Sequence, residues 1–169
     1  NSKIQGGGVM YNFSLPFNIR YELYSFGGYN TKKGNAAGFY RYPTSIPASV
    51  RTNVFASYPN GFLPEINSEV NDLSLGAGLR AKFGVWNADL SYVYGINTFD
   101  FNITNSVNYT EALTTANFKK EFDAGGLTFR QGTLNLDVSR RYDIMHGLNV
   151  ALGGEFRQDG FAIRAGDNL

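Results

Sequence analysis

Hydrophobic and polar residues alternate over long stretches of this chain, which is the period of a β-strand. In residues 72–83, DLSLGAGLRAKF, every second position from Leu73 to Phe83 is apolar, and the positions between them are polar or glycine. After a two-residue gap the alternation resumes in residues 86–97, WNADLSYVYGIN. The pattern predicts two strands joined by a tight turn, which together make a β-hairpin.

Two further hairpins follow from the same pattern. TLNLDVSRRY and LNVALGGEFR alternate on either side of the short connection DIMHG, although Arg140 interrupts the apolar face of the first stretch. Near the N-terminus, GVMYNF and IRYELYSF flank SLPFN. The sequence therefore predicts an all-β chain without a helical period. The six expected strands cover residues 3–13, 18–27, 69–83, 86–101, 126–142 and 147–163.

The connections between the hairpins are much longer than the turns within them, and cover residues 28–67 and 102–125. In an antiparallel up-and-down sheet, all short turns then lie at one end and all long loops at the other. The first long loop contains ASYPNGFLPEI, in which residues 59–61 predict a turn and Pro64 is expected to keep the chain out of the ladder. Phe62 and Leu63 either order this loop or contact a ligand.

Three features favour a segment of a large transmembrane β-barrel over a soluble β-sandwich, the ordinary alternative for an all-β chain of this size. The strands exceed the ~5–6 residues usual in soluble sheets and suffice for the ~9–11 tilted residues of a membrane crossing. Long irregular loops are uncommon in compact soluble domains but common outside such barrels. Aromatic residues also collect near the short turns, as in an interfacial girdle: Phe13, Phe17, Phe83, Trp86 and Tyr142.

The polar face of the predicted sheet carries many ionisable groups. Burying them in a packed core would cost several kcal/mol each unless they were paired, so we expect a water-filled or plugged lumen. The expected lumen-facing residues are Asp72, Arg80, Lys82, Asp89, Asp137, Arg141, Glu155 and Arg157, with Asn87 and Asn135. They contact a plug and solvent, or else pair as Asp137 with Arg141 and Glu155 with Arg157. Six strands are fewer than the ~8 of the smallest barrels, so further strands are expected from additional sequence or partner chains.

Composition excludes several functions. The 15 basic and 14 acidic residues are spread along the chain, so no nucleic-acid partner is expected. With no cysteine and a single histidine, His146 in a predicted turn, we expect no metal, no cofactor and no catalytic triad, and hence no enzyme. The longest stretch without charge, residues 4–19, contains polar residues and a proline and lacks the ~20 apolar residues of a membrane helix.

Several separated segments resemble the mid-barrel region of TonB-dependent outer-membrane receptors. They are YELYSFGGYNTKKGNAAGFYRYP, YPNGFLPEI, WNADLSYVYGINTFDFNITNSVN, FDAGGLTFRQGTLNLDVSRRYD and LNVALGGEFRQDGFAIRAGD, which cover nearly the whole chain. The resemblance implies a barrel of about 22 strands closed by a plug, located in the bacterial outer membrane among its lipids. It also implies uptake of a scarce ligand, such as a siderophore, cobalamin, a glycan or a peptide, driven by the TonB complex. The plug and the TonB box have no counterpart in residues 1–169.

The first long loop holds the candidate ligand contacts. The cluster GFYRYP supplies three aromatic rings and a guanidinium, which suit sugars, catechols or peptides, although packing of the loop is an equal alternative. The candidate ligand-binding residues are Phe39, Tyr40, Arg41, Tyr42, Tyr58 and Phe62. A passive porin or adhesin-like barrel and a soluble β-sandwich binding domain remain the alternative functions. Solubility without detergent distinguishes the last of these.

Overall fold

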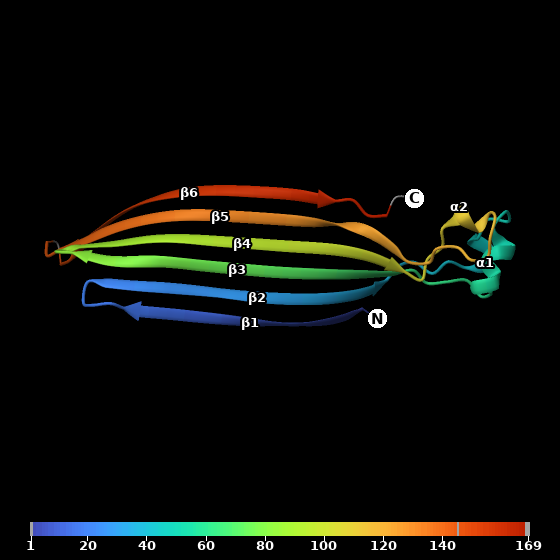
Figure 1. Cartoon of the computed structure of the whole chain (residues 1–169), viewed down its shortest axis with the longest axis horizontal. Helices are drawn as coiled ribbons and strands as arrows, with labels where there is room; N and C mark the ends of the chain where they lie inside the picture. The colour runs from blue at the N-terminus through green and yellow to red at the C-terminus, as the bar shows by residue number, and fades with distance from the viewer. Residues whose placement is uncertain (1, 145, 168–169) are drawn as a thin grey trace.

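The computed structural model describes residues 2–144 and 146–167, and its strands form one antiparallel sheet in sequence order (Figure 1). The strands are β1 (Lys3–Pro16), β2 (Tyr21–Ala37), β3 (Glu65–Phe83), β4 (Trp86–Thr104), β5 (Phe122–Tyr142) and β6 (Leu148–Arg164). The predicted all-β, up-and-down topology with three hairpins is therefore confirmed. The sheet is open, because β1 and β6 each pair with one neighbour only among the described residues.

All three hairpin turns lie at the same end of the sheet, as the sequence predicts (Figure 1). The side chain of Asn18 closes the first turn by accepting hydrogen bonds from the backbone N–H groups of Arg20 and Tyr21. Gly84, with φ +61°, forms the second turn, and Gly147, with φ +109°, ends the third. A glycine suits both positions because positive φ is strained for residues with a Cβ. Met145, within the third turn, lies outside the described residues.

The strands extend farther toward the long loops than predicted. The expected loops over residues 28–67 and 102–125 shorten to residues 38–64 and 105–121. The register of β2 with β3 continues from Tyr29↔Leu73 to Ala37↔Glu65 through residues that are polar on both faces. Backbone hydrogen bonds hold this part of the ladder without hydrophobic alternation, so the sequence period does not reveal it. β1 ends at Pro16 instead of residue 13, β2 begins at Tyr21 instead of residue 18, and β6 covers Leu148–Arg164 instead of residues 147–163.

The remaining segments contain short helices, contrary to the expectation of none. A 3₁₀ turn covers Pro43–Ser45, α1 covers Arg51–Ser57 and α2 covers Tyr109–Ala112. These elements are too short to show a helical hydrophobic period. None of the helices in the described residues is long and apolar enough to cross a membrane. The turn predicted at residues 59–61 is present, with Gly61 at φ +90° donating to the carbonyl of Tyr58.

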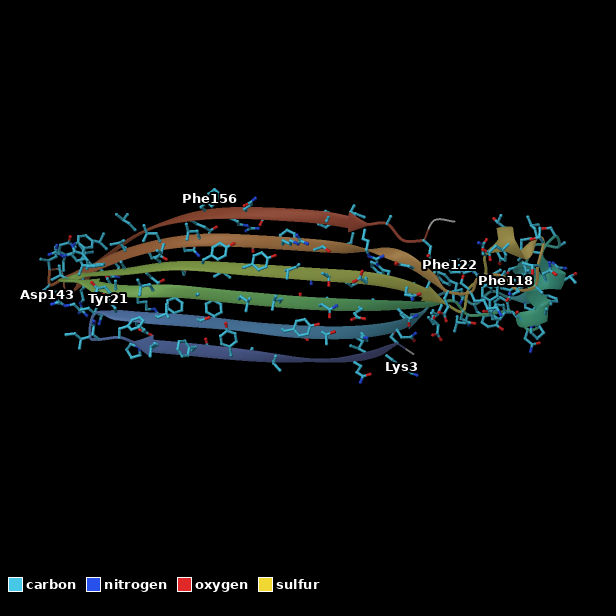
Figure 2. All side chains as sticks on the ribbon, in the orientation of Figure 1. Lys3, Tyr21, Phe118, Phe122, Asp143 and Phe156 are labelled. Carbon is cyan, nitrogen blue, oxygen red and sulfur yellow. The ribbon has the colours of Figure 1, made fainter. Side chains whose placement is uncertain are left out.

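The sheet is a single layer, and almost all of the buried hydrophobic residues lie outside it (Figure 1). We call residues 38–64 and 105–121 the loop unit, because their apolar side chains pack on one another at the end of the sheet opposite the short turns. Figure 2 shows Phe118 among the side chains of this unit, with Tyr21 and Asp143 at the other end. Ala81 is the one buried hydrophobic residue found on the described strands. Both faces of the sheet are therefore uncovered.

Candidate functional site

The register separates the side chains of the sheet onto two chemically different faces, because residues directly opposite on antiparallel strands share a face. One row of directly opposed residues runs through Glu22, Arg80, Asp89 and Asp137 on four successive strands. The face that contains this row is the polar face. All eight of the predicted lumen-facing residues lie on it: Asp72, Arg80, Lys82, Asp89, Asp137, Arg141, Glu155 and Arg157.

Arg80 is the centre of a charged network on the polar face. Its guanidinium lies 3.3 Å from a carboxylate oxygen of Glu22 and 3.2 Å from one of Asp89, and it stacks 4.3 Å from the ring centroid of Tyr24. The Tyr24 hydroxyl in turn donates to Asp89 over 2.7 Å. These contacts tie β2, β3 and β4 together. Sequence reasoning did not include Glu22 and Tyr24, which become visible once the register sets them opposite Arg80 and Gly78.

The other predicted charges of the polar face have different partners from those considered. Asp72 accepts a hydrogen bond from Asn97 on β4. Arg157 pairs with Asp159 on its own strand, at 2.9 Å. Among the ion pairs of the described residues, neither Asp137 with Arg141 nor Glu155 with Arg157 occurs, so these two possible pairings do not form.

The polar face is uneven because its glycines serve two purposes. Near the short turns, the rings of Tyr24 and Phe26 lie over Gly78 and Gly76 and fill the space that side chains would take. Farther toward the loops, glycines on β1, β2 and β4 leave a hollow of about 850 Å³, with Asp72, Asn97 and Gln131 among its lining. The polar face therefore offers an open depression with a largely apolar lining and a few hydrogen-bonding side chains, rather than a packed surface.

The loop unit has a hydrophobic core built from both long connections. Its buried residues are Ile46, Val50, Val54, Phe62, Ala112 and Phe118, with Phe55, Tyr58 and Val107 packed around them. Two hydrogen bonds join the connections: Asn53 Nδ2 donates to the carbonyl of Ala112 over 2.9 Å, and Asn105 Nδ2 donates to that of Leu63 over 2.7 Å. The two loops thus form one ordered body.

Four of the six predicted ligand contacts lie on the surface of the loop unit. Phe39 and Tyr42 are 85% and 64% exposed, and the rings of Tyr40 and Tyr42 meet edge to face at 5.1 Å. Arg41 is held by its backbone, which exchanges hydrogen bonds of 2.7 and 3.0 Å with Phe62. Its guanidinium is therefore placed by the loop and stays exposed. The Tyr40 hydroxyl donates to the carbonyl of Asn60.

The other two predicted contacts belong to the core of the loop unit. Phe62 is 5% exposed, and its ring centroid lies 5.0 Å from that of Tyr58. Tyr58 also faces Phe118 at 6.3 Å, and burial raises the pKa of its hydroxyl. The sequence predicts that Phe62 either orders the loop or contacts a ligand, and its buried position fits the first role. We therefore exclude Tyr58 and Phe62 from the candidate ligand surface, which reduces to residues 39–42.

A second charged network ties the last described residues to the start of β5. Arg164 pairs with Asp100 at 3.0 Å and with Asp123, and Lys119 pairs with Asp167 at 2.7 Å. The guanidinium of Arg164, followed by the backbone N–H of Gly125, holds the pKa of Asp123 below its usual value. The ammonium of Lys119, followed by the backbone N–H of Asp123, does the same for the pKa of Asp167.

The apolar face of the sheet carries a band of hydrophobic side chains near the short turns, most of them partly or largely exposed, which we call the apolar belt. It comprises Val9, Tyr11, Phe13 and Leu15 on β1; Tyr21, Leu23 and Tyr29 on β2; Leu73, Leu75, Ala77, Leu79, Ala81 and Phe83 on β3; Trp86, Ala88, Leu90, Tyr92, Tyr94 and Ile96 on β4; Leu134, Leu136, Val138 and Tyr142 on β5; and Leu148, Val150, Leu152 and Phe156 on β6. Beyond it, β3 continues on this face with Asn71, Glu69 and Asn67.

The apolar belt runs obliquely to the rows of directly opposed residues. Measured from the row through Glu22 and Asp137, its lower end lies one residue toward the turns at Tyr21 and five residues toward them at Tyr142. Its upper end stays seven residues from this row at Tyr29, Leu73 and Ile96 and is three residues from it at Leu134. From β2 to β5, each end of the belt is therefore displaced by four residues over three strand steps. With ~3.4 Å per residue and ~4.8 Å between strands, this displacement makes an angle of about 40°.

Within the part of the chain that the structure describes, no group of three or more His, Cys, Asp or Glu side chains is arranged to hold a metal ion. His146 lies in the third turn with φ +66°. No protein-family model matches the chain, and a comparison with curated proteins gives no significant match. Function is therefore inferred from the two faces of the sheet, the loop unit and the sequence resemblance.

Proposed function

We propose that the chain is a wall segment of a transmembrane β-barrel in the bacterial outer membrane, and that this barrel belongs to a TonB-dependent receptor. The receptor takes up a scarce ligand, such as a siderophore, cobalamin, a glycan or a peptide. The apolar belt is the observation that carries the membrane part of this proposal. The receptor part is supported by the sequence resemblance and by the ordered loop unit.

The dimensions of the apolar belt match a lipid bilayer. It spans nine residues on β2, from Tyr21 to Tyr29, and eleven on β3, from Leu73 to Phe83. Transmembrane strands need ~9–11 residues when tilted by ~45°, and barrel strands tilt by ~35–45°. The oblique course of the belt supports the same tilt, because a strand inclined by about 40° brings the belt level with the membrane plane.

The chemistry of the two faces also fits a membrane wall. A monomeric soluble protein rarely exposes apolar patches larger than a few hundred Å². Side chains of the belt nevertheless remain uncovered, with Leu152 and Phe156 at 75% and 68% exposure. Lipid supplies the missing cover, while the polar face with its Arg80 network lines a wet or plugged lumen. Pairing of β1 and β6 with further strands satisfies their free edges, as a membrane requires.

The loop unit supplies the receptor function. The loop unit lies beyond those ends of the strands where the residues are mostly polar (Figure 1). The resemblance places this side outside the cell. The core of the loop unit fixes residues 39–42 at the surface, where exposed aromatic rings and the Arg41 guanidinium are available for stacking and hydrogen bonding. Energy coupling belongs to a plug and a TonB box outside residues 1–169, and the hollow on the polar face offers such a plug a contact surface.

Single spin labels along β3 test the membrane part, because the chain has no cysteine that would interfere. Labels at Leu75 and Leu79 are expected to be accessible to oxygen and protected from a water-soluble nickel complex, and labels at Ser74 and Lys82 on the polar face are expected to show the reverse. The matched control is Asn71, which shares the face of Leu75 but lies beyond the apolar belt and should meet the nickel complex. Equal nickel access at Leu75 and Asn71 would rule out a lipid-facing belt and favour a soluble sheet.

A second experiment separates a receptor from a passive porin or an adhesin. The coding sequence on both sides of residues 1–169 is read for a signal peptide, a plug domain and further alternating strands. All three are expected for a receptor of about 22 strands. Further strands without a plug would instead identify an unplugged barrel.

A further inference from the structure

Arg140 is a charged residue within the span of the apolar belt on β5, between Leu134 and Tyr142. It alternates with Val138 and Tyr142 along β5, and the register sets it opposite Trp86 on β4 and Val150 on β6. An arginine on the lipid side of a barrel costs ~2–4 kcal/mol at the bilayer midplane but only ~0–1 kcal/mol near an interface. In a barrel wall, Arg140 therefore requires a position near the membrane interface, a partner for its charge, or both.

The surroundings of Arg140 hold its guanidinium without neutralising it. The guanidinium carbon lies 4.4 Å from the ring centroid of Tyr142 and 5.4 Å from that of Trp86. Its Nε is buried and has no hydrogen-bond partner. Among the described residues, no carboxylate forms an ion pair with it. The two rings thus orient a planar, charged donor that forms no ion pair with the described residues.

The level of Arg140 in the proposed membrane indicates which anions can reach its guanidinium. Trp86 and Tyr142 are the belt residues nearest to the short turns on β4 and β5. Arg140 precedes Tyr142 by two residues and therefore lies just inside the edge of the belt. Aromatic rings at such an edge mark the headgroup region, and a long arginine side chain reaches toward it. The anions present at that depth are lipid phosphates, which match the fork of an arginine in a bidentate manner.

We propose that Arg140, Trp86 and Tyr142 form a binding site for the phosphate of a phospholipid in the leaflet at the short-turn side. The site selects lipids with a net negative headgroup, such as phosphatidylglycerol, because no carboxylate balances the arginine. A zwitterionic lipid brings its own ammonium, which competes for the phosphate. This inference rests on the proposed function, since it requires the strands to cross a bilayer.

Fluorescence of Trp86 tests the site directly, because it is the one tryptophan in the sequence. The protein is reconstituted in phosphatidylcholine vesicles, and a fraction of the lipid is replaced by brominated phosphatidylcholine or brominated phosphatidylglycerol, which quench tryptophan on contact. The ratio of the two quenching curves gives the relative association constant at Trp86. We expect about a fivefold preference for phosphatidylglycerol, as one arginine near an anionic lipid surface provides.

Two variants locate the preference. Arg140→Gln keeps a polar side chain of similar length but no charge, and should reduce the ratio to about one. Arg130→Gln removes another arginine from the same face of β5, near the opposite edge of the belt, and should leave the ratio unchanged. A ratio near one in the unaltered protein, or a preference that survives Arg140→Gln, would overturn the assignment.

The experiment separates this site from the proposed function. Quenching by brominated phosphatidylcholine without any preference leaves the lipid-facing belt in place and removes the phosphate site, whereas absence of quenching by either lipid removes both. Millimolar inorganic phosphate at constant ionic strength is expected to leave the ratio at about fivefold. If free phosphate reduces the ratio to one, the ligand is a soluble phosphate, and the assignment to lipid is wrong.

Discussion

The hydroxyl of Tyr24 on β2 donates a hydrogen bond of 2.7 Å to Asp89 on β4 and thereby crosses the whole width of β3. The crossing is possible because the strand between them presents Gly78 under the tyrosine ring, where any side chain would collide with it. The bond also brings Asp89 into the network around Arg80. Because Gly78 has no Cβ, three strands can share a polar contact on a face that lacks a packed core.

Gly78→Ala is expected to destabilise the sheet by about 1–3 kcal/mol, because the new methyl group displaces the Tyr24 ring and breaks its bond to Asp89. Urea unfolding in detergent micelles, followed through Trp86 emission, measures the change. Gly154→Ala is the matched control, since a Cβ at Gly154 meets nothing within 4 Å. Equal midpoints for the two variants would show that the glycine is not needed for the crossing.

Phe118→Ala is expected to loosen the loop unit and to leave the strands intact. Phe118 is 4% exposed and belongs to a core of six buried residues, so the truncation leaves a cavity that costs about 3–5 kcal/mol of local stability. Hydrogen exchange should accelerate in both segments of the loop unit, because their cores are shared. Phe39→Ala, which removes an 85% exposed ring, is the control and should change neither segment. Acceleration of exchange in residues 105–121 alone would contradict a shared core.

Acid is expected to release the tether between the start of β5 and the last described residues. The folded pKa values of Asp123 and Asp167 lie below the unfolded value of about 3.9, so both carboxylates stabilise the folded state fully above that pH. Their contribution is lost as pH falls through the lowered pKa values. The amides of Asp123 and Gly125, which donate to these carboxylates, should then lose protection against hydrogen exchange.

The control for this pH effect is the amide of Ser106, which donates to the carbonyl of Lys120 and has no titrating partner. Its protection factor should stay constant over the same pH range. Parallel loss of protection at Ser106 and Gly125 would indicate general unfolding of the loop unit instead of a carboxylate effect.

The sequence predicts the sheet well where one face has uniform surroundings, because hydrophobic and polar residues then alternate strictly, as from Leu73 to Phe83. It fails where the ladder continues through largely polar residues, from Asn30 to Asn35, because backbone pairing leaves no trace in hydrophobicity. Cross-strand partners depend on register, which explains why Glu22 was missed beside Arg80. Arg157 instead pairs with Asp159, two residues along its own strand and on the same face. Tyr58 and Phe62 looked like ligand contacts because aromatic residues in a loop serve packing and binding alike.

The reduced candidate surface leads to a final prediction about the ligand. The purified protein is tested by calorimetry against a ferric catecholate, cobalamin, an oligosaccharide and a short peptide. For the class that binds, Arg41→Gln is expected to weaken affinity by about tenfold, the effect of losing one charge-assisted or cation–π contact. Hydrogen exchange in the loop unit should stay unchanged, because the structural contacts of Arg41 are made by its backbone.

Two comparison variants distinguish a direct ligand contact of Arg41 from an effect on the folding of the loop unit. Leu113→Ala removes another exposed side chain of the loop unit, away from residues 39–42, and should bind like the unaltered protein. Phe62→Ala should weaken binding together with an increase in hydrogen exchange, because it removes the core that positions Arg41. Unchanged affinity in Arg41→Gln, with weak binding in Phe62→Ala, would move the ligand surface away from residues 39–42 to another part of the loop unit.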